Sequence, residues 1–506
     1  MTQEKRPENE LSDAAASAIK RNKKNGQQKE DRFSKRDYKP STWKPELDED
    51  GNPIKAERRP KRKVACMIGY CGTDYNGMQI QNNPDVKTIE GELFQAFVAA
   101  GAISKDNLTD LMKNGFQRAA RTDKGVHAAG NVVSLKLIIE DKDVVKKINA
   151  HLPPHIRVWG YERTNRSFDS RRMCSSRIYE YLLPTHSLLP SRPQSSLYNL
   201  IAESKQRYLG ILRDDPDTAW WATIHAAIVA GGVSAEELDS VYLRTAETTL
   251  DQKSDVKKKA YHDENGDISE WGRLVKKVRD IENSCRREYR VNAEKLDLFK
   301  AAMKQYEGTH NFHNFTLGKT YNDPSSRRFM KSTSVSDPFI IEGTEWVSIK
   351  IHGQSFMLHQ IRKMICMAAL VVRTGCPITR ISDCFGPAKI NIPKAPALGL
   401  LLECPVYESY NEKLGDSGHN PIDFSKYATE MNAFKLKNIY DKIYAEELKE
   451  NLFFGYFEFL DTFKGSGATK EGKHIFDFLG AVFNNQMENK ESTKPLAGDK
   501  APENID

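Results

Sequence analysis

The spacing of apolar residues near the start of the chain predicts alternating strands and helices. Val64–Tyr70 is expected to form a strand, and residues 133–139 are typical of one because their apolar side chains alternate with mostly polar ones. Between them, a helix is expected from about Thr88, where apolar residues recur at helical spacing and Glu90 lies in a first turn whose dipole favours acids. These elements predict an α/β unit.

The same alternation returns later in the chain. Trp346–His352 is expected to form a strand, and apolar residues then follow at helical spacing until Gly375, a residue suited to end a helix. The expected apolar face of this helix consists of Leu358, Ile361, Ile365, Ala368 and Val372. The chain therefore contains two α/β halves, and the mixed-charge segment between them is interpreted as a partly helical insertion.

These patterns divide the chain into six parts. The expected boundaries are 1–63 for a disordered basic arm, 64–194 for the first half, 195–298 for the insertion, 299–408 for the second half, 409–485 for a helical C-terminal extension and 486–506 for a disordered tail. Low apolar content is the reason for expecting disorder at both ends.

Charge is concentrated in the arm. The 506 residues carry a net charge of +7, of which residues 1–63 alone contribute +6 and residues 486–506 contribute −2. The remaining +3 on residues 64–485 is too little for nucleic acid binding through the overall field, so any such binding needs a local patch. No apolar run approaches the length of a membrane span, and the eight scattered cysteines are typical of a reduced intracellular protein.

Two basic clusters, Lys20–Lys24 and Arg58–Lys63, mark the arm. Such clusters suit the acidic groove of a nuclear import receptor or the phosphates of RNA, and a solubilising tail is the plain alternative.

The loop from Arg121 to Ala128 has the strongest chemical pattern. It places Asp123 between Arg121 and Lys124, whose positive charges would keep the carboxylate ionised for use as a nucleophile or base. The alternative is structural, because Thr-Asp-Lys-Gly is also favourable β-turn chemistry.

Two further side chains could act with this loop. Arg362 lies among apolar residues of the second predicted helix, where it needs a carboxylate or anionic partner unless it extends to the surface. Tyr179 lies with Arg177 and Tyr181 on one face of a predicted strand, and it could stack on a nucleobase or pack within the sheet. His310 and His313 make no convincing zinc signature, and no phosphate-binding glycine loop indicates ATP-dependent chemistry.

Taken in order, these pieces resemble one family, the TruA-type tRNA pseudouridine synthases. The similar segments are Tyr70–Gln79, in which Cys71 and Met78 depart from the family pattern, then Arg121–Ala128, Phe168–Arg171 with Arg177–Tyr181, Gly308–Phe315, Phe356–Arg362 and Ala395–Leu400. They span residues 70–400, and the ordered set is more specific than any single motif. The basic arm, the insertion and the extension favour a fungal nuclear member over a bacterial one.

The resemblance implies a role for each candidate residue. Asp123 would be the catalytic carboxylate, acting on C1′ or on the 2′ proton, with adduct formation at the base as an older alternative. Arg362 would pair with Asp123, Tyr179 would stack on the uracil and could take the C5 proton, and Arg121 would fill the space of the flipped nucleotide. Lys124 and His127 would contact the substrate, and Lys257–Lys259 and Lys276–Arg290 would follow phosphates or form solvated faces.

The resemblance also implies a fold and partners. It predicts an α/β (α+β) fold of two similar subdomains, whose mixed, largely antiparallel sheets join around a central catalytic cleft. The expected substrates are tRNA, including pre-tRNA, and also snRNA and mRNA, in the nucleus and with no membrane contact. No cofactor is needed, a structural zinc ion stays open, and a monomer is favoured. The rival hypotheses are a non-catalytic RNA-binding or chaperone protein, an N-glycoside hydrolase and a nuclear adaptor.

Overall fold

A computed structural model describes residues 59–81, 83, 85–104, 114–207, 212–250, 267–415 and 417–462 of the chain. The predictions for most of the basic arm, for Lys257–Lys259 and for the C-terminal tail fall outside these residues. Among the helices that are described, none is long and apolar enough to cross a lipid bilayer.

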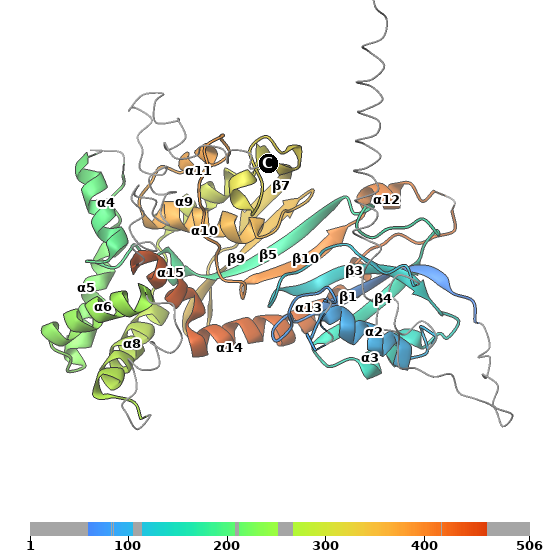
Figure 1. The fold of residues 1–506 in the computed structure, drawn as a ribbon, viewed down its shortest axis with the longest axis horizontal. Helices are drawn as coiled ribbons and strands as arrows, with labels where there is room; N and C mark the ends of the chain where they lie inside the picture. Colours follow the sequence, from blue (N-terminus) through green and yellow to red (C-terminus); the bar gives the residue numbers. More distant parts are fainter. Residues whose placement is uncertain are drawn as a thin grey trace, which may run out of the picture. The chain divides into compact units, whose positions relative to one another are not determined.

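A single mixed sheet of ten strands joins the two halves (Figure 1). Its strands are β1 (Arg62–Tyr70), β2 (Gln117–Arg118), β3 (His127–Leu137), β4 (Ile156–Arg163), β5 (Ser176–Pro184), β6 (Gly308–Asn311), β7 (Arg327–Val335), β8 (Phe339–Ile341), β9 (Thr344–Gly353) and β10 (Leu400–Val406). The order is β4-β1-β3-β10-β5-β9-β7-β6, with β2 beside β3 and β8 beside β9. Only β3 and β10 pair in parallel among these strands, so the expected mixed, mostly antiparallel character is confirmed.

The first strand begins earlier than expected. Arg62 and Lys63 already pair with β3, and the ammonium group of Lys63 donates a hydrogen bond to the Gly115 carbonyl at 3.0 Å. The predicted end of the arm at residue 63 is therefore corrected, because its last two residues belong to the sheet.

The two helices predicted for the halves are present as α2 (Ile89–Ala99) and α10 (Gln360–Arg373), with one change. The other helices of the halves are α3 (Val144–His151), α9 (Ala293–Lys304) and α11 (Arg380–Asp383). The Thr88 hydroxyl accepts a hydrogen bond from the Gly91 N–H and so caps α2, and Gly375, with φ of +71°, follows the end of α10. Leu358 was expected on the buried face of α10, but it precedes the helix and is 53% exposed.

The described residues between 195 and 298 form several helices with an apolar core of their own. These helices include α4 (Ser196–Arg207), α5 (Trp220–Ala230), α6 (Ala235–Leu250) and α8 (Glu270–Glu288). The core consists of Trp221, Ile224, Ile228, Val233, Leu238, Val241, Val275 and Val278. The Trp221 indole donates to the Pro190 carbonyl at 3.1 Å, which ties this core to the end of the first half.

The C-terminal extension packs against the centre of the sheet. It includes α12 (Glu408–Glu412), α13 (Ala428–Phe434), a π-helical turn (Lys435–Tyr440), α14 (Asp441–Glu450) and α15 (Leu452–Thr462). The Lys435 ammonium group contacts Glu403 of β10 at 2.9 Å and Glu180 of β5 at 3.5 Å. The Tyr440 hydroxyl donates to Glu180 at 2.7 Å. Because Glu180 alternates with Tyr179 along β5, these contacts lie on the face opposite that tyrosine.

Candidate active site

A cavity of about 860 Å³ lies where the two halves meet. Its walls come from residues 76–81 and 118–124 of the first half and residues 355–361 of the second, together with Val126, Arg171, Arg177, Tyr179, Arg328 and Leu400. Four of the predicted site residues line it, namely Arg121, Asp123, Lys124 and Tyr179. Arg362 and His127 do not.

Asp123 lies in a tight turn between β2 and β3. The Val126 N–H donates to the Asp123 carbonyl at 3.1 Å, and Gly125 between them has φ of +76°, a conformation that glycine adopts without strain. The predicted β-turn is therefore present, and it coincides with the candidate catalytic loop. The Asp123 side chain is 32% exposed, which leaves the carboxylate accessible from the cavity.

The segment after β1 holds this turn in place. The Met78 N–H donates to the Thr122 carbonyl at 3.2 Å, and the Gly125 N–H donates to the Tyr75 carbonyl at 3.3 Å. A Cβ atom on Gly72 would lie 2.1 Å from the Val126 carbonyl oxygen, so only glycine fits there. The motif at Tyr70–Gln79 thus contributes a backbone scaffold, and its contact with the catalytic loop explains the glycine at position 72.

Buried side chains complete the scaffold. The hydroxyls of Tyr70 and Thr122 are 2.9 Å apart, and the Asn131 amide donates to the Ala120 carbonyl at 3.2 Å. Tyr70 and Asn131 are fully buried. These groups fix both sides of the loop that precedes Asp123.

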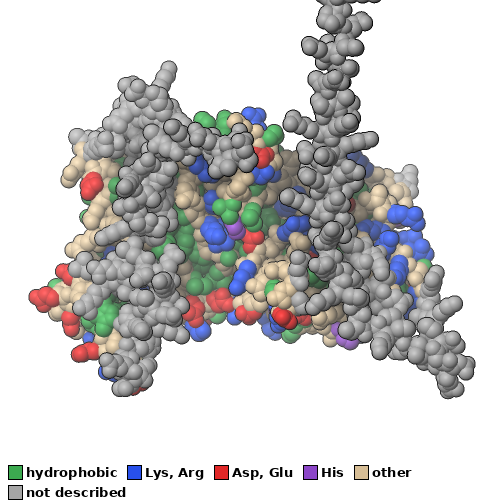
Figure 2. All heavy atoms as spheres, in the orientation of Figure 1, with side chains coloured by type: hydrophobic (Ala, Val, Ile, Leu, Met, Phe, Trp, Pro, Cys, Tyr) green, Lys and Arg blue, Asp and Glu red, His purple; other side chains and the backbone are tan. Residues whose placement is uncertain are grey.

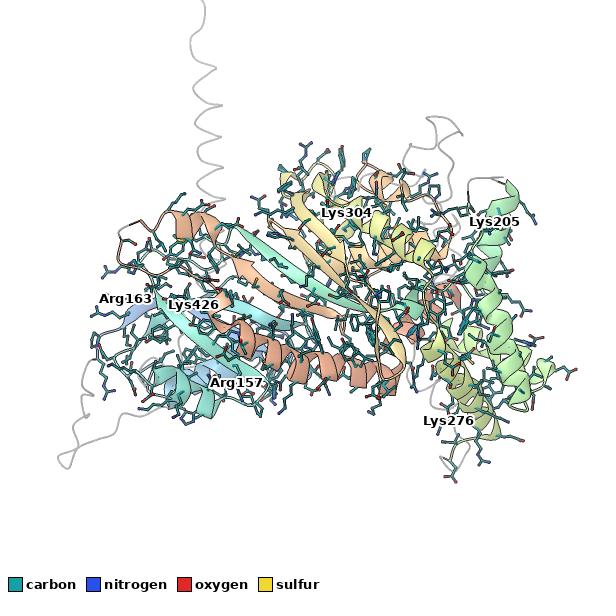
Figure 3. All side chains as sticks on the ribbon, turned by 180° about the vertical axis from the view of Figure 1, so that it is seen from behind. Arg157, Arg163, Lys205, Lys276, Lys304 and Lys426 are labelled. Atoms are coloured by element: carbon teal, nitrogen blue, oxygen red, sulfur yellow. The ribbon has the colours of Figure 1, made fainter. Side chains whose placement is uncertain are left out.

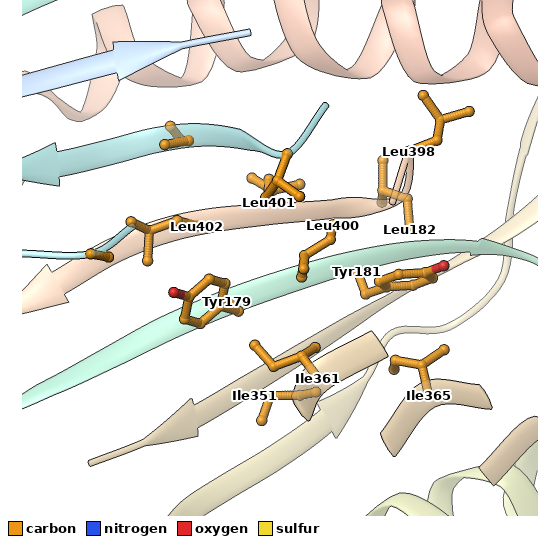
Figure 4. Packing of buried hydrophobic residues seen from close by; sticks show 14 of the residues in the cluster. Tyr179, Tyr181, Leu182, Ile351, Ile361, Ile365, Leu398, Leu400, Leu401 and Leu402 are labelled. Carbon is orange, nitrogen blue, oxygen red and sulfur yellow. The ribbon is translucent and has the colours of Figure 1, made fainter. Parts of the chain in front are cut away.

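Tyr179 lines the same cavity. It lies at the centre of the sheet, where Figure 4 shows it on β5 among Leu400, Leu402 and Ile351. On β5 it pairs with Leu402 of β10 and Ile351 of β9, and its ring meets Phe356 edge to face with centroids 5.1 Å apart. Burial raises the pKa of Tyr179 to about 12. The phenol is therefore neutral near pH 7, and its ring forms an apolar floor beside the carboxylate.

Positive charge surrounds this floor. The basic side chains that line the cavity are Arg118, Arg121, Lys124, Arg171, Arg177 and Arg328. Asp123 is the one carboxylate among the lining residues, although Arg118 is itself paired with buried Glu90. Figure 2 shows Lys and Arg side chains near the middle of one face of the molecule, with acidic and hydrophobic ones between them. The cavity lining itself therefore has an excess of basic side chains.

The chain was compared with known proteins. Residues 302–408 match the family model described as tRNA pseudouridine synthase. The tRNA pseudouridine synthase 1 of Candida albicans is 55% identical over 461 residues, covering 89% of this chain and 74% of that protein. The protein of the same name from Saccharomyces cerevisiae is 53% identical, with 86% and 80% covered. The chain belongs to the TruA family of tRNA pseudouridine synthases. The tRNA pseudouridine(27/28) synthase of S. cerevisiae is also similar, at 40% identity over 76% of this chain and 96% of that protein.

Pseudouridine synthases are isomerases, and the resemblance seen in the sequence motifs is confirmed. Sequence reasoning nevertheless missed two residues that join the halves of this synthase. The Arg177 guanidinium donates to the Ala119 carbonyl at 3.1 Å and to the Gln354 carbonyl at 3.0 Å, so it links the catalytic loop to the second half. His359 lies against Asp123, with its Nδ1 atom 3.2 Å from Oδ2. The motif containing His359 was recognised, but spacing alone gave no signal of the contact.

Arg362 has a different partner from the one expected. No ion pair joins it to Asp123, although the structure describes both residues. Instead its Nε–H donates to the Ala395 carbonyl at 2.6 Å, and the Ala395 N–H donates back to the Arg362 carbonyl at 3.1 Å. This exchange attaches the start of α10 to the segment that leads into β10. A catalytic role for Arg362 stays a prediction.

The substrate contact expected of His127 is corrected. His127 is fully buried in the synthase, and its Nδ1 atom accepts a hydrogen bond from the Gly72 N–H at 3.1 Å. It therefore supports the scaffold of the catalytic loop rather than the substrate. Burial lowers the pKa of His127 to about 4, so the ring is neutral at physiological pH.

We expect His127 to make the stability of this synthase pH-dependent. Its pKa falls from 6.5 in the unfolded chain to about 4 in the folded one, so only the unfolded state binds the proton between these values. Stability is thus lost as the pH falls through this window, by about 2 kcal/mol between pH 7.5 and pH 5. Urea unfolding at both pH values, with the parent and His127→Asn, measures this loss. The loss of stability should be about 2 kcal/mol smaller in the variant than in the parent. Equal losses in the two proteins would contradict the assignment of this pH dependence to His127.

The described residues include no cluster of three or more His, Cys, Asp or Glu side chains that could hold a metal ion. His310 stacks on Phe385 at a centroid distance of 4.3 Å, and its Nε2 atom lies 2.7 Å from the Glu307 carbonyl oxygen. Whether the enzyme works without a cofactor is not tested by this geometry and stays a prediction.

Proposed function

We propose that this protein converts uridine to pseudouridine in tRNA, with Asp123 as the catalytic carboxylate. The observation that carries the proposal is the joint placement of Asp123 and Tyr179 in one cavity with a cationic lining. A carboxylate on one wall can meet the ribose, while an aromatic ring beside it can hold the base. Membership of the synthase family supports the same reaction.

The reaction needs only groups of this kind. The C1′–N1 bond of uridine breaks, the uracil turns, and C5 bonds to C1′ while C5 loses a proton and N1 gains one. Asp123 acts on the ribose by attack at C1′ or by removal of the 2′ proton, and both routes require an ionised carboxylate next to the sugar. The product is an isomer of the substrate, so no oxidant, reductant or energy source enters. We infer that no cofactor takes part.

Tyr179 and Arg121 have complementary roles in this proposal. A uridine within a stem must leave its stack to reach Asp123, and the aromatic floor offers a stacking surface for the extruded base. The raised pKa of Tyr179 disfavours the phenolate, which supports stacking over proton removal from C5. Arg121 is exposed at the cavity. Its side chain can therefore occupy the position in the RNA stem that the extruded uridine leaves.

The phosphates are held by the basic groups of the cavity and, we infer, by the insertion. Helix α8 exposes Lys276 on its outer side, as Figure 3 shows, together with Arg273, Lys277 and Arg279. The alternative is that these side chains form a solvated face without RNA contact. Replacing them with neutral residues should weaken the salt dependence of RNA binding if they bind phosphates, and should leave it unchanged if they do not.

The wider biological role extends this proposal. We infer that pre-tRNA, snRNA and mRNA are also substrates, because the cavity contacts are suited to one extruded uridine and the surrounding backbone. The basic clusters of the arm support nuclear import. The helices α13 to α15 cover the centre of the sheet, which supports a monomer. Each half contributes strands and helices to the shared sheet, and this arrangement supports the proposal that the halves are two similar subdomains.

Product analysis of an unmodified tRNA transcript labelled with tritium at C5 of uridine tests the function. The expected result is tritium release with an equal amount of pseudouridine, because C5 loses its hydrogen only when a new carbon–carbon bond forms there. An N-glycoside hydrolase would give free uracil and an abasic RNA instead. RNA binding without release, across a panel of tRNA, snRNA and mRNA substrates, would indicate a non-catalytic binding protein.

A further inference from the structure

His359 brings the second half of the protein into contact with the catalytic carboxylate. Its Nδ1 atom lies 3.2 Å from Oδ2 of Asp123, within the wall of the same cavity. The His359 side chain is 15% exposed, less than half the exposure of Asp123. No other charged or titratable side chain of the described residues forms an ion pair with Asp123.

The backbone around His359 is held in an unusual conformation. His359 has φ of +63° and ψ of 2°, a left-handed conformation that is uncommon for residues other than glycine, although asparagine, aspartate and histidine adopt it more often than the rest. Hydrogen bonds fix it on both sides, because the Thr316 hydroxyl donates to the Leu358 carbonyl at 3.0 Å and the Lys363 N–H donates to the His359 carbonyl at 3.1 Å. Such strain persists only where the surroundings enforce it. The imidazole is therefore placed rigidly against the carboxylate.

The charge state of His359 decides what this contact can do. Burial lowers the pKa of His359, the positive charges of Lys394 and Arg362 lower it further, and Asp123 opposes them. The ring is thus neutral at pH 7 and has a single N–H group. A ring nitrogen 3.2 Å from a carboxylate oxygen is favourable when it carries that hydrogen, so this distance favours the tautomer protonated at Nδ1.

We propose that His359 is a positioning residue, which donates a hydrogen bond from Nδ1 to Oδ2 of Asp123 and leaves Oδ1 for the ribose. In this arrangement the residue that directly precedes α10 orients the carboxylate that the first half supplies, so the site is complete only when the two halves are correctly packed against each other. Arg362, three residues further on, serves the segment before β10 instead. The proposal rests on the proposed function, because it takes Asp123 to act on the ribose.

Two substitutions that both tolerate the left-handed backbone test the hydrogen bond. His359→Gly removes the donor without strain, whereas His359→Asn retains an N–H group near the position of Nδ1. We expect His359→Gly to lower the single-turnover rate of pseudouridine formation by about 100-fold, since a misplaced group can cost that much. His359→Asn should recover to within about tenfold of the parent, and both variants should bind tRNA within about twofold of it. Equal rates for the two variants, or a loss confined to tRNA binding, would overturn the proposal.

A second measurement is independent of activity. Nitrogen-15 NMR of the histidine-labelled full-length protein at pH 7.5 reports the tautomer, and the His359→Asn spectrum assigns the signal by its absence. Protonation at Nδ1 that is perturbed in Asp123→Asn supports the contact, and an unprotonated Nδ1 overturns it. If the parent forms no pseudouridine in any RNA while Nδ1 is protonated, the proposed function fails and the contact stands.

Discussion

Replacing Asp123 with asparagine is expected to lower the rate of pseudouridine formation by at least about 10⁴-fold, as for the loss of other essential catalytic side chains. An amide is too weak a nucleophile and base to act at C1′ or on the 2′ proton. The change preserves the size of the side chain, and the turn around Asp123 is held by backbone contacts with Tyr75 and Met78. The tRNA affinity should therefore remain within about twofold of the parent, and tritium release under single-turnover conditions measures the loss.

Asp74→Asn is a matched control for this experiment. Asp74 belongs to the same scaffold as Met78, but it is exposed and does not line the cavity. Its φ of +67° suits asparagine, so the substitution makes the same chemical change without added strain. The control should retain the parent's rate. Parent-like activity of Asp123→Asn would exclude this carboxylate from the reaction, and a joint loss of activity and tRNA binding would indicate a folding defect.

Local patterns predicted some of the regular elements. Strand alternation located β3, β5 and β9, and Thr88 and Gly375 located the start of α2 and the end of α10, because these signals depend on neighbours in the sequence. Glu90 shows the limit of such reasoning. It was expected to favour the dipole of α2, but it is buried, pairs with Arg118 and accepts a hydrogen bond from the Ile80 N–H. That role depends on Ile80 and Arg118, which lie outside α2 and reach Glu90 only in the folded protein.

The sequence predicted which residues line the candidate site better than it predicted which of them contact one another. The left-handed conformation of His359 starts α10 two residues after Leu358, which exposes Leu358 and brings the imidazole to Asp123. No periodicity reveals such a backbone change, because tertiary hydrogen bonds enforce it. The same holds for His127, whose motif predicted a substrate contact although its position in β3 buries it. The parallel pairing of β3 with β10, which joins the halves, likewise depends on long-range order.

Replacing Asp461 with asparagine is expected to destabilise the protein by about 3–5 kcal/mol, the usual cost of breaking a buried ion pair on one side. The Arg373 guanidinium, at the end of α10, contacts both oxygens of Asp461 from α15, at 2.7 and 2.6 Å. The two side chains are only 3% and 4% exposed. Asparagine would leave the Arg373 charge buried without a carboxylate, and α15 would hold α10 less firmly. Urea unfolding at pH 7.5 measures the loss as a lower midpoint with an unchanged slope.

Two comparisons separate the buried charge from general damage to α15. Glu450→Gln breaks the exposed pair that Lys449 and Glu450 form at 2.8 Å, and it should cost less than about 1 kcal/mol. The double variant Arg373→Met/Asp461→Leu removes both charges, and it should recover most of the stability that Asp461→Asn loses, because the lone buried cation is gone. A double variant as unstable as the single one would assign the loss to packing of α15. His359 directly precedes α10, so full recovery of stability with parent-like activity would show that the anchoring of the end of this helix is separate from the chemistry at its start.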